Sequence, residues 1–184
     1  MKRLLMCALL LSPAGVTAAE PRQASIVAPP PIKALAPDHV AGLLAGAGLG
    51  YAKAAELNRY PGPLHVLELA EQLELDAAQL DATRALRARV VAQASALGAE
   101  LVAAEAELDA MFRSGSLSQA GMDEVLARIG TIQSRLRSVH LGAHIEQRAL
   151  LSPTQVDRYV RLRGYADADA DGHSHAHGAG GHAH

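Results

Sequence analysis

Two histidines four residues apart, His140 and His144, lie in the stretch HLGAHIEQRALLSPTQ, which runs from residue 140 to residue 155. On an α-helix this spacing places both imidazoles on one face, one turn apart, where they could bind the same metal ion. Two imidazoles alone form a weak site, so further ligands would have to come from another segment. The alternative interpretation is that both histidines are half-exposed polar residues at the edge of an apolar helix face.

Further ligands are expected from His65 and from Glu68, which lies one helical turn away from it. Imidazole and carboxylate donors without a thiolate suit Zn, Ni, Co or Cu(II), so the predicted cofactor is a divalent transition metal of this group. Met111 and Met122 could instead bind Cu(I), but both fall on apolar faces, and we expect them to belong to the core.

The last residues of the chain, 166–184, read ADADADGHSHAHGAGGHAH and form a second place for metal ions. Flexible imidazoles at this density should bind Zn, Ni or Cu(II) loosely. The histidines of this segment are His173, His175, His177, His182 and His184. A calcium loop would require a bidentate carboxylate at its twelfth position, which falls on Gly178. The segment lacks apolar periodicity, and we expect it to be disordered.

Residues 1–19 have the three parts of a secretory signal peptide. Lys2 and Arg3 precede an apolar run over residues 4–11, and small residues end at Ala19. This pattern predicts export to the periplasm, with a proline-rich leader over residues 20–36 at the start of the exported chain. The single cysteine of the sequence lies in the segment to be removed, so the exported chain can hold neither a disulfide nor a thiolate metal site.

The composition argues against several classes of protein. The chain has 17 basic and 19 acidic side chains, and loss of the two basic residues at positions 2 and 3 would leave it more acidic. No basic patch interleaved with aromatic residues is present, so we expect no binding to nucleic acid. Aromatic residues make up only 3%, which favours close packing of helices through alanine and leucine. No nucleophile with a partner base is evident, so we do not expect an enzyme.

Apolar residues recur in steps of three and four along two segments, which is the spacing of one apolar face on a packed helix. The first face consists of Val90, Ala94, Leu97, Leu101, Ala104, Leu108 and Met111, and the second of Met122, Val125, Ile129, Ile132, Leu136, Val139 and Ala143. The turn sequence RSGS separates them. We therefore predict an all-α domain over residues 37–165, built on a long antiparallel helical hairpin with arms of roughly 50 Å.

Short helices are expected to flank this hairpin, one over residues 37–57 and one from residue 63 to residue 73. Two pentads of the same plan, LDAAQ at residues 75–79 and LSPTQ at residues 151–155, predict helix starts. In each pentad, Asp76 or Ser152 can accept a backbone N–H of the first turn. The glutamine three residues later can reach back to the capping residue, which completes a capping box.

Two such pentads flanking a long helical hairpin, behind a signal peptide, resemble the LTxxQ family of periplasmic proteins. This family comprises Spy/CpxP-like chaperones and heavy-metal sensors of the CnrX and ZraP type, and residues 64–165 look most similar to the sensor branch. The resemblance implies an all-helical hooked hairpin, often an antiparallel homodimer, without catalytic chemistry. It also implies that His140 and His144 correspond to a ligand pair before the second pentad. Asp76 departs from the hydroxyl residue usual in the first pentad.

The predicted function is therefore that of a periplasmic metal-binding protein, a heavy-metal sensor or buffer in metal resistance or envelope stress. The alternative is a holdase chaperone whose apolar faces shelter unfolded protein clients. A third interpretation is a helical partner of a membrane signalling, transport or efflux protein. Metal binding by the chain up to residue 165 favours the first, and suppression of aggregation by the metal-free protein favours the second.

Overall fold

The computed structural model describes residues 31–165, which belong to one compact unit. The predicted all-α class is confirmed for these residues, which form helices and no strand. The helices are α1 (Pro37–Leu44), α2 (Lys53–Glu56), α3 (Pro63–Glu68), α4 (Ala77–Ser114), α5 (Gln119–Leu150) and α6 (Pro153–Leu162). None of them is long and apolar enough to cross a membrane. The predicted signal peptide and the histidine-rich segment, residues 166–184, lie outside the described residues.

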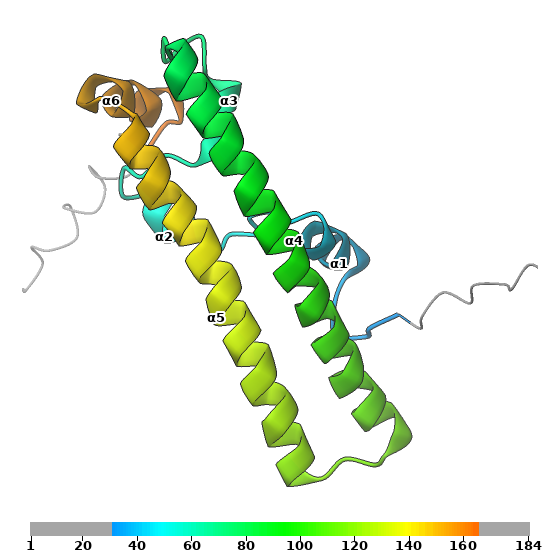
Figure 1. Ribbon diagram of the computed structural model, residues 1–184. Helices are drawn as coiled ribbons and strands as arrows, with labels where there is room; N and C mark the ends of the chain where they lie inside the picture. The colour runs from blue at the N-terminus through cyan, green and yellow to red at the C-terminus, as the bar shows by residue number, and fades with distance from the viewer. Residues whose placement is uncertain (1–30, 166–184) are drawn as a thin grey trace, which may run out of the picture. The chain divides into compact units, whose positions relative to one another are not determined.

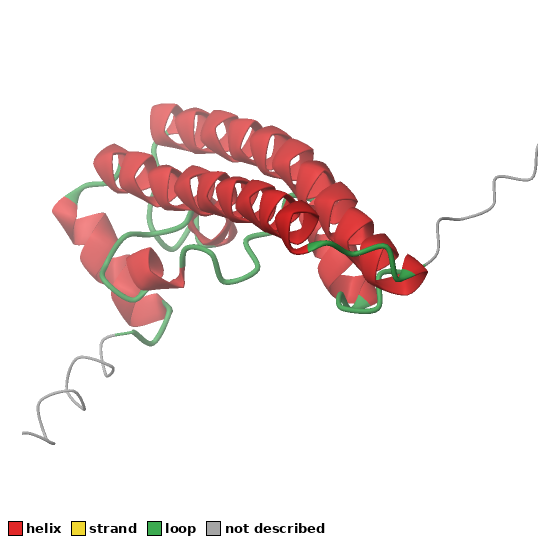
Figure 2. Ribbon diagram, turned by 90° about the horizontal axis from the view of Figure 1, so that it is seen from below, coloured by secondary structure: helices red, strands yellow, loops and turns green. Residues whose placement is uncertain are grey.

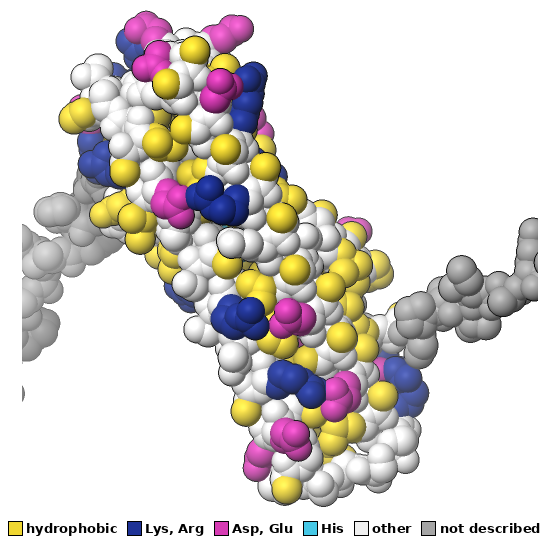
Figure 3. Space-filling model, in the orientation of Figure 1, with side chains coloured by type: hydrophobic (Ala, Val, Ile, Leu, Met, Phe, Trp, Pro, Cys, Tyr) yellow, Lys and Arg dark blue, Asp and Glu magenta, His cyan; other side chains and the backbone are white. Residues whose placement is uncertain are grey.

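The two long helices, α4 and α5, lie side by side along their length (Figure 1). Their 38 and 32 residues correspond to about 57 and 48 Å at the rise of an α-helix. Ion pairs between them join high residue numbers on one helix to low numbers on the other, so the helices run in opposite directions. These pairs are Arg89–Glu146, Arg135–Glu100 and Arg128–Glu107. Figure 3 shows such pairs of opposite charge along one exposed face.

The main core lies between the two long helices, and all but one of its buried members are residues that the three-and-four spacing singled out. Its buried members are Leu43, Ala94, Leu97, Leu101, Ala104, Val125, Ile129, Ile132 and Leu136. Only Leu43 comes from outside the two helices. Met111 packs against this cluster, as its apolar interpretation predicted, whereas the next residue along the helix, Phe112, is 60% exposed.

Both pentads form the predicted capping boxes at the starts of α4 and α6. The Asp76 carboxylate accepts the Gln79 backbone N–H at 2.8 Å, and the Ser152 hydroxyl accepts the Gln155 N–H at 3.2 Å. Each glutamine accepts the N–H of its capping residue in return. Helix α4 ends where Gly115 adopts a left-handed conformation with φ of 69°, which glycine reaches without steric cost.

The short helices cover one face of the long pair (Figure 2). The predicted helix over residues 37–57 is wrong in extent, because two glycines with positive φ, Gly46 and Gly50, interrupt it between α1 and α2. Helix α1 crosses α4 closely at Gly98, where a Cβ would lie 2.1 Å from the Leu43 carbonyl oxygen. Only a glycine permits this approach of two backbones.

A second core closes the end of the long pair at which α4 begins and α5 ends. It is formed by α3, α6 and the turns between α3 and α4, with Val66, Leu73, Leu151, Val156 and Tyr159 as its buried members. The predicted continuation of the helix from Pro63 to Leu73 is wrong, because α3 ends at Glu68. The turn that follows carries Leu73 into the second core, and its exposed fraction is 0%.

Candidate metal centre

A cavity of about 480 Å³ lies between the short helices and the long pair, and three of the predicted ligands line it. His140 and His144 come from α5, and His65 comes from α3 on the opposite wall. The cavity therefore has His65 and the histidine pair among its lining residues, and their role as metal ligands stays a prediction. Glu68 does not line this cavity, and the five histidines of the C-terminal segment lie outside the described residues.

His144 is buried, with 8% of its surface exposed, and its orientation is set by the backbone. Its Nδ1 lies 2.7 Å from the carbonyl oxygen of Tyr60. Because a carbonyl oxygen only accepts hydrogen bonds, Nδ1 carries the proton and Nε2 keeps a free lone pair. Histidines that bind metals are commonly held in this way, by a hydrogen bond from the other ring nitrogen.

Gly62 leaves space beside the same ring. A Cβ at this position would lie 2.9 Å from Cε1 and 3.0 Å from Nε2 of His144. The backbone of Gly62 is extended, with φ of −87°, so it is the missing side chain, and not an unusual conformation, that matters here. The lone pair of His144 therefore faces a space that any larger residue would fill.

His140 is also buried, with 7% exposed, so the half-exposed interpretation is wrong for both histidines. Its ring stacks on Tyr51 with a centroid distance of 5.8 Å and an angle of 3° between planes. Its Nε2 is buried and has no hydrogen-bond partner among the described residues. Burial lowers the pKa of His140, and the charges of His144 and Arg87 lower it further. The imidazole is thus neutral near pH 7, the form that binds metals.

His65 is oriented by Glu68, whose Oε2 lies 2.7 Å from Nδ1. The carboxylate accepts the Nδ1 proton, so Nε2 of His65 is left as the donor atom. This nitrogen lies 3.8 Å from Oε1 of Glu56. Glu68 therefore acts on the ring of His65 instead of lining the cavity, which differs from its predicted role as a direct ligand.

Glu56, at the end of α2, is a cavity residue that the sequence did not single out. Its Oε1 accepts hydrogen bonds from the hydroxyls of Tyr159 at 3.1 Å and Tyr165 at 2.9 Å, and from Arg163 at 3.4 Å. Burial alone would raise the pKa of Glu56, but the two hydroxyls, with the charges of His65 and Arg163, outweigh burial and lower it. The segment KAAEL around Glu56 contains no motif that indicates this role.

The three imidazoles line one cavity without meeting at one point. Within residues 31–165, no group of three or more His, Cys, Asp or Glu side chains is close enough together to hold a metal ion. The chemistry of the donors nevertheless fits a transition metal, because the site offers a buried Nε2 without a partner and an open space at Gly62.

Comparisons with protein-family models, with curated proteins and with solved structures find no match to this chain. The resemblance to the LTxxQ family, which rests on the two pentads and their placement, therefore stays a prediction.

Proposed function

We propose that this protein is an exported, non-enzymatic metal-binding protein that senses or buffers a divalent transition metal in the periplasm. The observation that carries the proposal is that His65, His140 and His144 line one cavity, although more than seventy residues of chain separate the first from the other two. Two of these imidazoles are buried, and burial of the Nε2 of His140 without a hydrogen-bond partner costs free energy that a bound metal would recover.

In this proposal the Nε2 atoms of His65, His140 and His144 hold the metal. The ion would supply a compact double positive charge, which suits three imidazole nitrogens beside the carboxylate of Glu56. Because the three donors do not meet at one point, binding has to draw α3 toward α5. A signalling partner would recognise this approach of α3 to α5. We further propose that the long pair acts as a hairpin of the Spy/CpxP type and forms a homodimer.

Metal titration of the full chain tests this proposal. Competition with chelators of known affinity should reveal one tight site per chain for Zn, Ni, Co or Cu(II), in addition to weaker sites. In a variant with both His140→Ala and His144→Ala, we expect the tight site to disappear while the weak sites remain. His39→Ala, an exposed histidine on α1, is the matched control and should leave the tight site intact. A tight site that survives the double substitution would refute the proposal.

A holdase chaperone is the second candidate, and exposed apolar side chains on the long helices favour it. Ile145, Phe112 and Leu126 are 62%, 60% and 44% exposed. Metal-free protein should then slow the aggregation of an unfolding test protein, and Phe112→Ser together with Ile145→Ser should weaken this protection. Equal aggregation with and without the wild-type protein would exclude the chaperone function under these conditions.

A further inference from the structure

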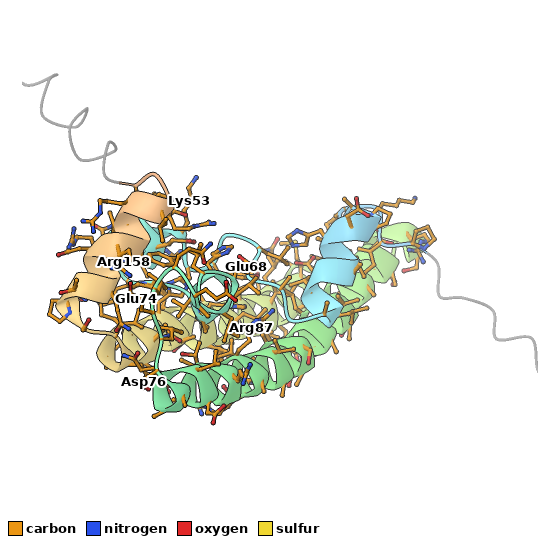
Figure 4. All side chains as sticks on the ribbon, turned by 90° about the horizontal axis from the view of Figure 1, so that it is seen from above. Lys53, Glu68, Glu74, Asp76, Arg87 and Arg158 are labelled. Atoms are coloured by element: carbon orange, nitrogen blue, oxygen red, sulfur yellow. The ribbon has the colours of Figure 1, made fainter. Side chains whose placement is uncertain are left out.

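The wall of the cavity carries an arginine side chain, Arg87. It is half-buried on α4, on the side of this helix that faces the short helices (Figure 4). Arg84, three residues earlier, forms an ion pair with Asp81, whereas Arg87 forms no ion pair with any side chain of residues 31–165. A half-buried guanidinium has lost part of its hydration, so an anion that approached it would be bound favourably.

The imidazole of His140 is a second polar group of the lining. Its Nε2 is buried and has no hydrogen-bond partner among the residues that the structure describes. Burial lowers the pKa of His140 most, and the charges of His144 and Arg87 lower it further, so the guanidinium is close enough to act on the ring. A neutral imidazole has one N–H, which on Nε2 can donate to an anionic oxygen. Arg87 and His140 can thus hold the same anion.

The balance of charge in the cavity also favours an anion. Lys53, an exposed residue of α2, is the second cation of the lining, and it forms no ion pair within the described part of the chain. Among the described lining residues, Glu56 is the one carboxylate. Its Oε1 accepts hydrogen bonds from Tyr159 and Tyr165, and Arg163 is its ion-pair partner at 3.4 Å. The carboxylate is therefore already compensated, whereas the two cations of the lining are left to attract an anion from solution.

Three large apolar side chains of the lining remain exposed to solvent. Leu49, Leu57 and Leu64 are 40%, 41% and 43% exposed. Leu49 has a left-handed backbone with φ of 43°, a conformation that leucine rarely adopts. Sites for small molecules usually combine a mainly apolar wall with a few polar groups that fix the orientation of the ligand. The cavity, of about 480 Å³, has this character, and a ligand with an apolar chain would cover the three leucines.

We propose that this cavity binds a small monocarboxylate with an apolar chain. The carboxylate accepts hydrogen bonds from the guanidinium of Arg87 and from Nε2–H of His140. The apolar chain lies along Leu49, Leu57 and Leu64, and its burial adds to the affinity. The inference goes beyond the proposed metal site and does not depend on it. Because His140 is also a proposed metal ligand, a metal ion and the carboxylate compete for it.

Calorimetric titration of the metal-free full chain with decanoate tests this inference. We expect one molecule of decanoate to bind per chain. Acetate, which lacks the apolar chain, and decanol, which lacks the charge, should each bind about tenfold or more weakly. Equal affinities for decanol and decanoate would overturn the inference. Weak binding of several decanoate molecules, without one tighter site, would also overturn it.

A pair of arginine variants tests the polar end of the site. Arg87→Gln should weaken decanoate binding about tenfold or more, because a charge-assisted hydrogen bond is lost, and should leave the affinity for decanol unchanged. Arg84→Gln is the matched control, since Arg84 is exposed on the same helix and does not line the cavity. Equal decanoate affinities of these two variants would contradict the role of Arg87 and overturn the inference.

A pair of leucine variants tests the apolar end. Leu57 and Leu44 are both exposed, at 41% and 49%, but only Leu57 lines the cavity. Leu57→Ser should weaken decanoate binding several-fold, whereas Leu44→Ser should leave it unchanged. Equal effects of the two substitutions would show that the apolar chain lies elsewhere, which would overturn the inference.

Metal titration of the Arg87→Gln variant separates this inference from the proposed function. The tight metal site should remain in this variant, because Arg87 is not a metal ligand. A wild-type chain that has no tight metal site, but binds decanoate through Arg87, would refute the proposed function and support the carboxylate site. A wild-type chain with a tight metal site, but no decanoate binding in its metal-free form, would overturn the carboxylate site alone.

Discussion

The side-chain amides of Gln79 and Gln155 donate to each other in a reciprocal pair of hydrogen bonds, both 2.9 Å long. The same two side chains complete the capping boxes of α4 and α6. Gln79 also donates to the carbonyl oxygen of Leu150, and Gln155 to that of Leu73. These hydrogen bonds connect the start of α4 to the start of α6, next to the second core.

We expect Gln79→Ala and Gln155→Ala each to lower the free energy of unfolding by about 1 kcal/mol or more, because each leaves polar groups without partners. The double variant should lose less than the sum of the two, since the pair is already broken by either change. Urea unfolding measures all three values. Gln119→Ala, which removes an exposed hydrogen bond to Asp123, is the control and should cost little. Strict additivity would contradict a coupled pair.

Two helical glycines, Gly98 at the crossing of α1 and α4 and Gly130 on α5, should respond in opposite ways to substitution by alanine. Gly98→Ala places a Cβ against the Leu43 carbonyl oxygen, so we expect it to destabilise the fold by about 1–3 kcal/mol. Gly130→Ala, in the interior of α5 with nothing within 4 Å, should stabilise it by up to about 1 kcal/mol through helix propensity. Thermal or urea unfolding would show these shifts, and a stabilising Gly98→Ala would be inconsistent with the close crossing.

A substitution that leaves every histidine in place should still impair the metal site. The Cβ of Gly62→Ala would meet the His144 ring at about 3 Å, so the ring has to turn away from the Tyr60 carbonyl group. We expect a loss of metal affinity of about tenfold or more. Gly142→Ala lies between the two histidines on α5 but has open space around it, and it should leave the affinity unchanged. Equal affinities of both variants would show that His144 is not a ligand.

The lowered pKa of Glu56 predicts a dependence of stability on pH. Because the carboxyl group is more acidic in the folded chain than in the unfolded one, its ionised form stabilises the fold above the unfolded pKa of about 4.3. This stabilisation is lost as the pH falls through the folded pKa. We expect Glu56→Gln, measured by urea unfolding with a chelator present, to be less stable than wild type at neutral pH and to lose less stability in acid. Glu71→Gln, an exposed control, should follow the wild-type curve.

Features that depend on residues three or four positions apart could be predicted from the sequence. The capping boxes at Asp76 and Ser152 were expected because their hydrogen bonds close within one helical turn. The buried stripes of α4 and α5 were expected because helix geometry alone places such positions on one face. The spacing of His140 and His144 likewise placed both on one face of α5.

The surroundings of those histidines followed from tertiary structure alone. The orientation of the His144 ring depends on the carbonyl group of Tyr60, 84 residues away, and the hydrogen bonding of Glu56 depends on Tyr165, 109 residues away. No local pattern encodes such a pair, because the free energy of each contact arises only when the second core and the short helices have packed against the long pair. The sequence by itself therefore determined the long helices, their starts and their apolar faces. Packing decided that the cavity lies on the face that the short helices cover, and which side chains line it.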